Sequence, residues 1–173
     1  MSTIQIQKIS KTNIKVDAIV NAANSALSHG GGVCGAIFNV AGPSEMARAC
    51  NAIGHCDTGN AVITPGFNLP SKYVIHAVGP VWQGGDKNEP KLLYSAYKQS
   101  LTVAKENDCH SIAFPLISAG IYGYPQDGAW RIALQACSDF IVNNPDYSID
   151  ITFAVLDDRI KGLGESIRLE LGI

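Results

Sequence analysis

The segment from Ala18 to Gly35, AIVNAANSALSHGGGVCG, constrains the fold of this chain more than any other. A short apolar run leads to two asparagines, Asn21 and Asn24, and three consecutive glycines then precede a helix-like stretch. Short β-branched runs of this kind are typical of buried parallel strands. Glycines leave backbone N–H groups uncovered, so a phosphate can approach the start of the following helix. The segment therefore predicts a strand–loop–helix unit. Its asparagine amides can bond sugar hydroxyls, which indicates a nucleotide-sugar ligand.

Strand-like and helix-like patterns alternate along the rest of the chain. Apolar runs predict strands at residues 4–6, 17–21, 61–64, 73–78, 111–115 and 149–156. Helical periodicity predicts helices at residues 33–40, 45–50, 90–107, 126–142 and 159–169. Ser44 is the predicted N-cap of the second helix. Such alternation indicates an α/β fold with a mixed, mostly parallel sheet that helices cover on both faces. In sheets of this type, ligands bind at the carboxyl ends of the strands.

Composition excludes several function classes. The 173 residues, 46% hydrophobic and 16% charged, are sufficient for one globular domain. The formal charge of −2 gives no reason to expect nucleic-acid binding, and the absence of a long apolar run gives none to expect a membrane partner. Five irregularly spaced cysteines indicate free thiols in a reducing cytoplasm. Without a CxxC pair, and with scattered histidines, we expect neither a metal nor another cofactor.

A second loop, Ser118 to Pro125 (SAGIYGYP), follows a predicted strand and precedes a predicted helix. Its small residues expose backbone N–H groups ahead of a helix N-terminus, so two loops could hold a diphosphate from both sides. Tyr122 could pack on a ribose or a base. The alternative is that Tyr122 and Tyr124 are ordinary half-buried aromatic residues.

Other residues have simpler interpretations beside the functional ones. Cys34 lies near the start of a predicted helix, but a nucleophilic thiol needs a positioned base, so a plain buried thiol is the simpler interpretation. His76 follows strand residues and is expected to be a hydrogen-bonded core histidine. Asp157 and Asp158 either cap the last helix or face the site.

Four blocks in order give this chain a resemblance to a known family: VNAANSAL-x-x-GGGV-x-GAI, DTG-x-AVIT, VIHAVGPVWQGG and SAGIYGYP. The chain resembles the macro domain family, in particular its MacroD-like ADP-ribosyl hydrolases. The resemblance covers nearly the whole length and implies one domain over residues 1–173, folded as a three-layer α/β/α sandwich. It implies that the chain is a monomer and that its partner is ADP-ribose or an ADP-ribosylated protein. The implied activity is removal of ADP-ribose from acidic side chains, or deacetylation of O-acetyl-ADP-ribose.

The resemblance also implies roles for individual residues. Asn24 would bond the distal ribose and help to position the attacking water, while Asn21 would brace the strand end beneath the ligand. Two backbone segments would contact the distal ribose and the diphosphate: Gly30, Gly31, Gly32 and Val33, and Ser118, Ala119, Gly120, Ile121 and Tyr122.

The chain departs from the family pattern at both ends of the implied ligand. Ser10 and Lys11 are both expected to contact the ligand. Ser10 stands where an aspartate of the family usually accepts a hydrogen bond from the adenine amino group. Leu156 matches an aromatic residue that often stacks on adenine. Cys34 stands at the position of the catalytic aspartate, and Phe38 replaces a common histidine. These departures predict a slow, substrate-assisted hydrolase. The alternatives are a non-catalytic ADP-ribose reader and a macro domain with a changed nucleotide ligand.

Overall fold

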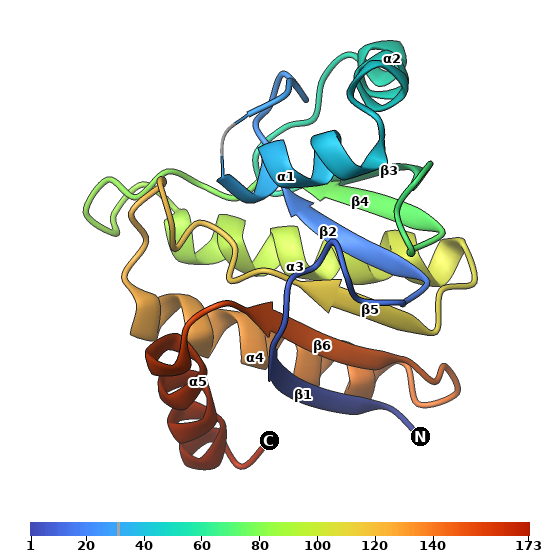
Figure 1. Ribbon diagram of the computed structural model, residues 1–173. Coiled ribbons are helices and arrows are strands. Elements are labelled where there is room, and N and C mark those ends of the chain that lie inside the picture. The colour runs from blue at the N-terminus through green and yellow to red at the C-terminus, as the bar shows by residue number, and fades with distance from the viewer. Residues whose placement is uncertain (31) are drawn as a thin grey trace.

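The computed structural model describes residues 1–30 and 32–173, without the side chains of residues 32 and 33 (Figure 1). Its elements follow the predicted alternation. In chain order they are β1 (Thr3–Lys8), β2 (Ala18–Ala22), α1 (Gly32–Ala41), α2 (Pro43–Ile53), β3 (Ala61–Pro65), β4 (Tyr73–Ala77), α3 (Glu89–Glu106), β5 (Ser111–Phe114), α4 (Gln126–Asn143), β6 (Asp150–Val155) and α5 (Asp158–Leu171).

These strands form one sheet in the order β1-β6-β5-β2-β4-β3. Strand β3 is antiparallel to β4, and the other pairs are parallel, which confirms the mixed, mostly parallel sheet. The ends of β1, β6, β5, β2 and β4 therefore lie along the same edge. In Figure 1 the arrowheads of β2, β5 and β6 point to the left, toward it. The residues that follow these five strands form the carboxyl edge.

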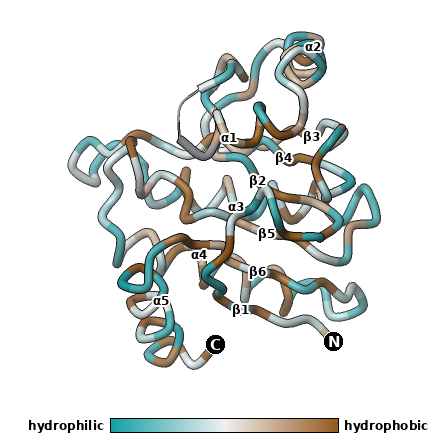
Figure 2. Tube along the Cα trace, viewed as in Figure 1, coloured by the Kyte–Doolittle hydropathy of each residue, from teal (hydrophilic) through white to brown (hydrophobic). Residues whose placement is uncertain are grey.

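Helices cover the two faces of the sheet, as the nearly continuous burial of β2, β4, β5 and β6 requires. Val20 belongs to the core under α3, α4 and α5, whereas its neighbour Ile19 packs under α1 and α2. Figure 2 shows hydrophobic segments along the central strands and hydrophilic segments on the outer loops. The three-layer α/β/α arrangement is confirmed. No helix among the described residues is long and apolar enough to cross a bilayer.

The two predicted helix caps have different outcomes. Ser44 is not an N-cap, because α2 begins one residue earlier at Pro43, after Gly42 with φ +112°. Proline suits the first turn of a helix, since it has no N–H that would need a partner there. Asp157 is the N-cap of α5, where its carboxylate accepts hydrogen bonds from the N–H groups of Arg159 and Ile160.

Candidate functional site

The two loops singled out in the sequence lie side by side at the carboxyl edge. Strands β2 and β5 are parallel neighbours, with Ala18 opposite Ile112, so the segments that follow them leave the sheet together. Each segment leads into a helix, α1 at Gly32 and α4 at Gln126. The N-terminus of an α-helix carries partial positive charge and free N–H groups. Two such termini at adjacent strand ends favour binding of an anion.

Several backbone N–H groups of the loop after β5 donate no hydrogen bond to the described residues. Two hydrogen bonds close it, from the Tyr124 N–H to the Ser118 carbonyl (2.9 Å) and from the Gly123 N–H to the Gly120 carbonyl (3.0 Å). Ser118 adopts a left-handed backbone conformation, with φ +67°. Four N–H groups of the loop have no acceptor among the described residues: those of Ser118, Gly120, Ile121 and Tyr122. Donors of this kind can bind phosphate oxygens.

The segment after β4 supports this loop. A Cβ atom on Gly79 would lie 2.2 Å from the Ser118 Oγ, so only glycine permits the close approach. The Trp82 N–H donates to the Tyr122 carbonyl at 2.8 Å. The ring centroids of Trp82 and Tyr124 lie 4.7 Å apart. Tyr124 is buried and belongs to the core, whereas Tyr122 is half-buried. Tyr124 is therefore a core residue and not the half-buried aromatic of the simpler interpretation.

Asn21 lies beneath the site in a buried polar network. Its amide nitrogen lies 3.1 Å from the Nδ1 of His76 and donates to the Cys34 Sγ at 3.4 Å. The His76 Nε2 lies 3.0 Å from the Thr64 Oγ1. Burial lowers the pKa of His76 to about 4, so the core imidazole is neutral near pH 7. Asn21 is fully buried, and its Oδ1 has no hydrogen-bond partner among the described residues, so a bond from its amide to a sugar hydroxyl stays a prediction.

Asn24 and Cys34, the two predicted catalytic residues, are connected through Ser28. The Asn24 amide nitrogen donates to the Ser28 Oγ (3.1 Å) and carbonyl (3.3 Å), and its Oδ1 accepts from the Ser28 N–H at 3.1 Å. The buried Cys34 Sγ lies 3.8 Å from the same Ser28 carbonyl. Ser28 was not among the predicted site residues. Its spacing of four residues from Asn24 is a signal for such a side-chain-to-backbone turn.

Part of the glycine segment contributes through close packing. A Cβ atom on Gly35 would lie 2.6 Å from the Gly30 carbonyl oxygen, so the first turn of α1 requires glycine there. Gly32 and Val33 begin α1, while Gly31 lies outside the described residues. The backbone contacts predicted for this segment therefore stay predictions.

Ser10 and Leu156 come together at the other end of the carboxyl edge. The Ile9 N–H donates to the Val155 carbonyl at 3.0 Å, which continues the pairing of β1 with β6. Ser10 and Leu156 are the next residues on these two chains. The Ser10 Oγ lies 2.9 Å from the Thr12 Oγ1, and Leu156 is 67% exposed.

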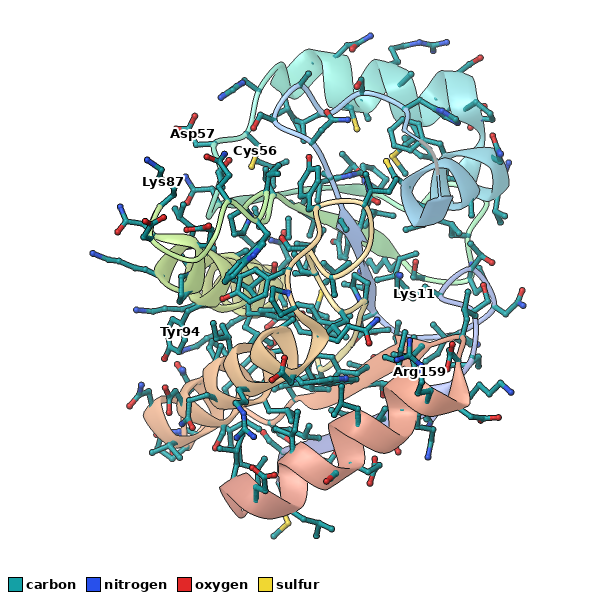
Figure 3. The ribbon with its side chains drawn as sticks, turned by 90° about the vertical axis from the view of Figure 1, so that its left-hand side faces the viewer. Lys11, Cys56, Asp57, Lys87, Tyr94 and Arg159 are labelled. Atoms are coloured by element: carbon teal, nitrogen blue, oxygen red, sulfur yellow. The ribbon has the colours of Figure 1, made fainter. Side chains whose placement is uncertain are left out.

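Lys11 is the unusual residue of this corner. It is only 6% exposed, and burial lowers the pKa of its ammonium group to about 7. Figure 3 looks onto the carboxyl edge and shows Lys11 and Arg159 on one side of it, with Cys56, Asp57 and Lys87 on the other.

Two hollows in the surface lie away from these residues. One of about 270 Å³ lies beside α2 and Phe67, and another of about 370 Å³ lies between α3 and α4. No group of three or more His, Cys, Asp or Glu side chains in the described part of the chain is arranged to hold a metal ion.

Comparison with known proteins agrees with this geometry. The macro domain family model matches residues 20–133. A protein of Escherichia fergusonii named O-acetyl-ADP-ribose deacetylase is 50% identical over 147 residues, which are 83% of this chain and 82% of that protein. A structure of the Oceanobacillus iheyensis macrodomain with ADP superposes with a TM-score of 0.90 at 36% identity, covering 96% of this chain and 90% of that one. The Trypanosoma brucei macrodomain in complex with ADP-ribose gives 0.88 at 36% identity, over 95% and 68% of the two chains. The family model, these relatives and the three-layer fold show that this chain belongs to the macro domain family.

Proposed function

We propose that this chain, as a single domain over residues 1–173, binds ADP-ribose along the carboxyl edge. The observation that carries the proposal is the group of N–H donors in the loop after β5 for which the described part of the chain provides no acceptor. They lie next to the N-termini of α1 and α4, where a diphosphate would be stabilised. Similar macrodomains in complex with ADP and with ADP-ribose support this ligand. All five cysteines are free, which supports a reducing compartment such as the cytoplasm.

The proposed reaction is hydrolysis of ADP-ribosyl esters. A water molecule held between a ligand phosphate and the distal ribose forms a bond to C1″ as the C1″–ester oxygen bond breaks. The electron pair leaves with the carboxylate, and the ligand phosphate accepts the proton from water. Asn24 would position this water after exchanging its bonds to Ser28. The named deacetylase relative supports ester hydrolysis. A missing carboxylate base typically costs about 10²–10⁴-fold in rate, so Cys34 predicts a slow enzyme.

One observation favours a second candidate function. The amide of Asn24 is engaged on both sides by Ser28, and the Cys34 thiol accepts from Asn21. Neither group is free to activate water in this arrangement. A macro domain of this kind would bind ADP-ribose without turning it over, as a reader.

Calorimetry with ADP-ribose, followed by hydrolysis assays on mono-ADP-ribosylated protein and on O-acetyl-ADP-ribose, tests both candidates. For a hydrolase we expect Asn24→Ala to lower turnover by about 10²-fold or more, since positioning of water is lost. Cys34→Asp should raise turnover, because it supplies a carboxylate base.

Cys34→Ser is the matched control, since it removes the thiol without adding a carboxylate. Binding by the wild type with no product over hours would establish the reader. An active wild type whose turnover Cys34→Asp leaves unchanged would show that residue 34 does not stand where a base acts.

A further inference from the structure

The outward side of α2 faces away from the core of the protein. Met46 and Cys50 are the buried residues of this helix, so its opposite side points toward solvent. That side consists of exposed or half-buried residues, here called the α2 stripe: Ser44, Glu45, Arg48, Ala49 and Ala52. In Figure 1, α2 lies at the top of the molecule, and no other described element lies beyond it. The α2 stripe is therefore accessible to a second molecule.

Two opposite charges lie at the centre of the α2 stripe. Glu45 and Arg48 are three residues apart, so they lie on neighbouring turns of one helix face. Neither side chain takes part in an ion pair with the described residues. Together with Ala49 and Phe67, they surround a hollow of about 270 Å³. An acidic and a basic side chain beside one hollow suit a partner that presents the same two charges in reverse order.

Phe67 borders this hollow in an unfavourable backbone conformation. It is 39% exposed and has φ +51°, in the left-handed region that bulky residues rarely adopt. The Leu69 N–H donates to the Gly66 carbonyl at 3.0 Å, which makes Phe67 the second residue of a turn. When φ is positive, that position is usually glycine, asparagine or aspartate. A strained and exposed aromatic side chain points to a contact outside the chain.

We propose that the α2 stripe and Phe67 form the interface of a symmetric dimer of this chain. When two copies of α2 pack antiparallel about a two-fold axis, Glu45 of each copy faces Arg48 of the other. Ser44 then faces Ala49, and these small side chains permit close approach of the two helices. The antiparallel arrangement also places the N-terminus of each helix beside the C-terminus of the other, which the helix dipoles favour. Because the α2 stripe is complementary to itself, a second copy fits it better than an unrelated partner.

The dimer is expected to be weak. Interfaces that bury less than roughly 1,200 Å² in total are typical of transient contacts, and one helix face with one aromatic side chain belongs to this class. Exposed ion pairs add little to such an interface. We expect a dissociation constant on the order of 100 µM. At about 5 µM the chain is then the monomer that the family resemblance implies.

Sedimentation velocity of the full chain from about 5 µM to about 1 mM measures this dimer. The fraction of dimer should rise over this range and fall in about 1 M salt, which screens the two ion pairs. Glu45→Arg and Arg48→Glu should each raise the dissociation constant about tenfold or more, because each places like charges opposite one another. The double variant with both changes should restore the dimer, and so should an equimolar mixture of the two single variants.

Phe67→Asn tests the aromatic contact while keeping the turn, since asparagine tolerates a positive φ. It should raise the dissociation constant about tenfold. The matched control is Leu169→Asn in α5, at the other end of the molecule in Figure 1, where the leucine is 83% exposed. This control should leave the dissociation constant unchanged. A wild type that stays monomeric at about 1 mM overturns the proposal. A double charge variant that dimerises no better than the two single variants overturns it too.

Discussion

Buried polar side chains near the carboxyl edge fall into two kinds. Asn21, His76 and Thr64 bond one another across neighbouring strands, and the histidine stays neutral. Lys11 has no such partner among the described residues. The hydrogen bonds of this network stabilise the strand ends, although the buried Asn21 Oδ1 has no partner among the described residues, whereas desolvation of an ammonium group opposes folding. Residues of the second kind are common at functional sites, where stability is lost in exchange for binding.

At the residue scale, Lys11→Met should stabilise the protein. The pKa of Lys11 is about 7 when folded and 10.5 when free, so the unfolded chain binds more protons between these values. Burial of the charged Lys11 therefore lowers the free energy of unfolding of the wild type most strongly below about pH 7. This destabilisation disappears as the pH rises toward 10.5. We expect the variant to gain roughly 1–4 kcal/mol in the free energy of unfolding at pH 7 and little at pH 10. Urea denaturation at both pH values measures this.

The exposed Lys15→Met variant is the control and should change the free energy of unfolding by less than about 0.5 kcal/mol. An equal gain for Lys11→Met at pH 7 and pH 10 would contradict the electrostatic explanation and indicate better packing alone.

At the element scale, the first residue of α3 organises the loop before it. Glu89 is 1% exposed, and its carboxylate accepts from the N–H groups of Gln83 (2.8 Å), Gly85 (2.9 Å) and Lys87. The same loop carries Trp82, which bonds the loop after β5. A helix start outside the loop after β5 therefore helps to position the proposed diphosphate donors.

Glu89→Gln should destabilise this loop and weaken the acid sensitivity of the fold. Burial alone would raise the pKa of Glu89, but the backbone N–H groups of Gln83, Gly85 and Lys87 hold it at about 2. Because this value lies below the 4.5 of a free glutamate, its stabilisation is full above about pH 4.5 and is lost as the pH falls toward 2.

We expect Glu89→Gln to unfold at lower urea concentration than the wild type at pH 7, with a difference that narrows at pH 3. The exposed Glu45→Gln, in the first turn of α2, is the matched control and should behave like the wild type. A constant difference across this pH range would show that the carboxylate charge is not the cause.

At the scale of the whole molecule, α5 closes the core at the β1 end of the sheet. A Cβ atom on Gly164 would lie 2.7 Å from the ring of Trp130 and 2.8 Å from the Ile6 Cδ1. The Trp130 ring is fully buried, and its Nε1 donates to the Ile160 carbonyl at 3.1 Å. Elements from both ends of the chain thus meet at one glycine.

Gly164→Ala should therefore lower the free energy of unfolding by about 1–3 kcal/mol, because the added methyl overpacks the contact with Trp130. Gly162→Ala, two residues earlier in the same helix, meets nothing within 4 Å. It should stabilise by up to about 1 kcal/mol, since alanine favours a helix over glycine. Thermal denaturation of the two variants measures the contrast, and equal effects would contradict a tight α5 interface.

The sequence by itself determined the order of elements, the mixed sheet and the two loops at its edge. Each of these depends on local patterns: apolar periodicity, glycine positions and turn residues. Only the tertiary structure decided which side chains are satisfied. It buried Asn21, connected Asn24 to Ser28, and engaged Asp157 and Asp158 in other bonds. It also gave the Lys11 ammonium group no acceptor among the residues that the structure describes. Hydrogen bonding and burial depend on neighbours distant in the sequence, such as β6 and α5 around the end of β1. No local pattern along the chain contains that information.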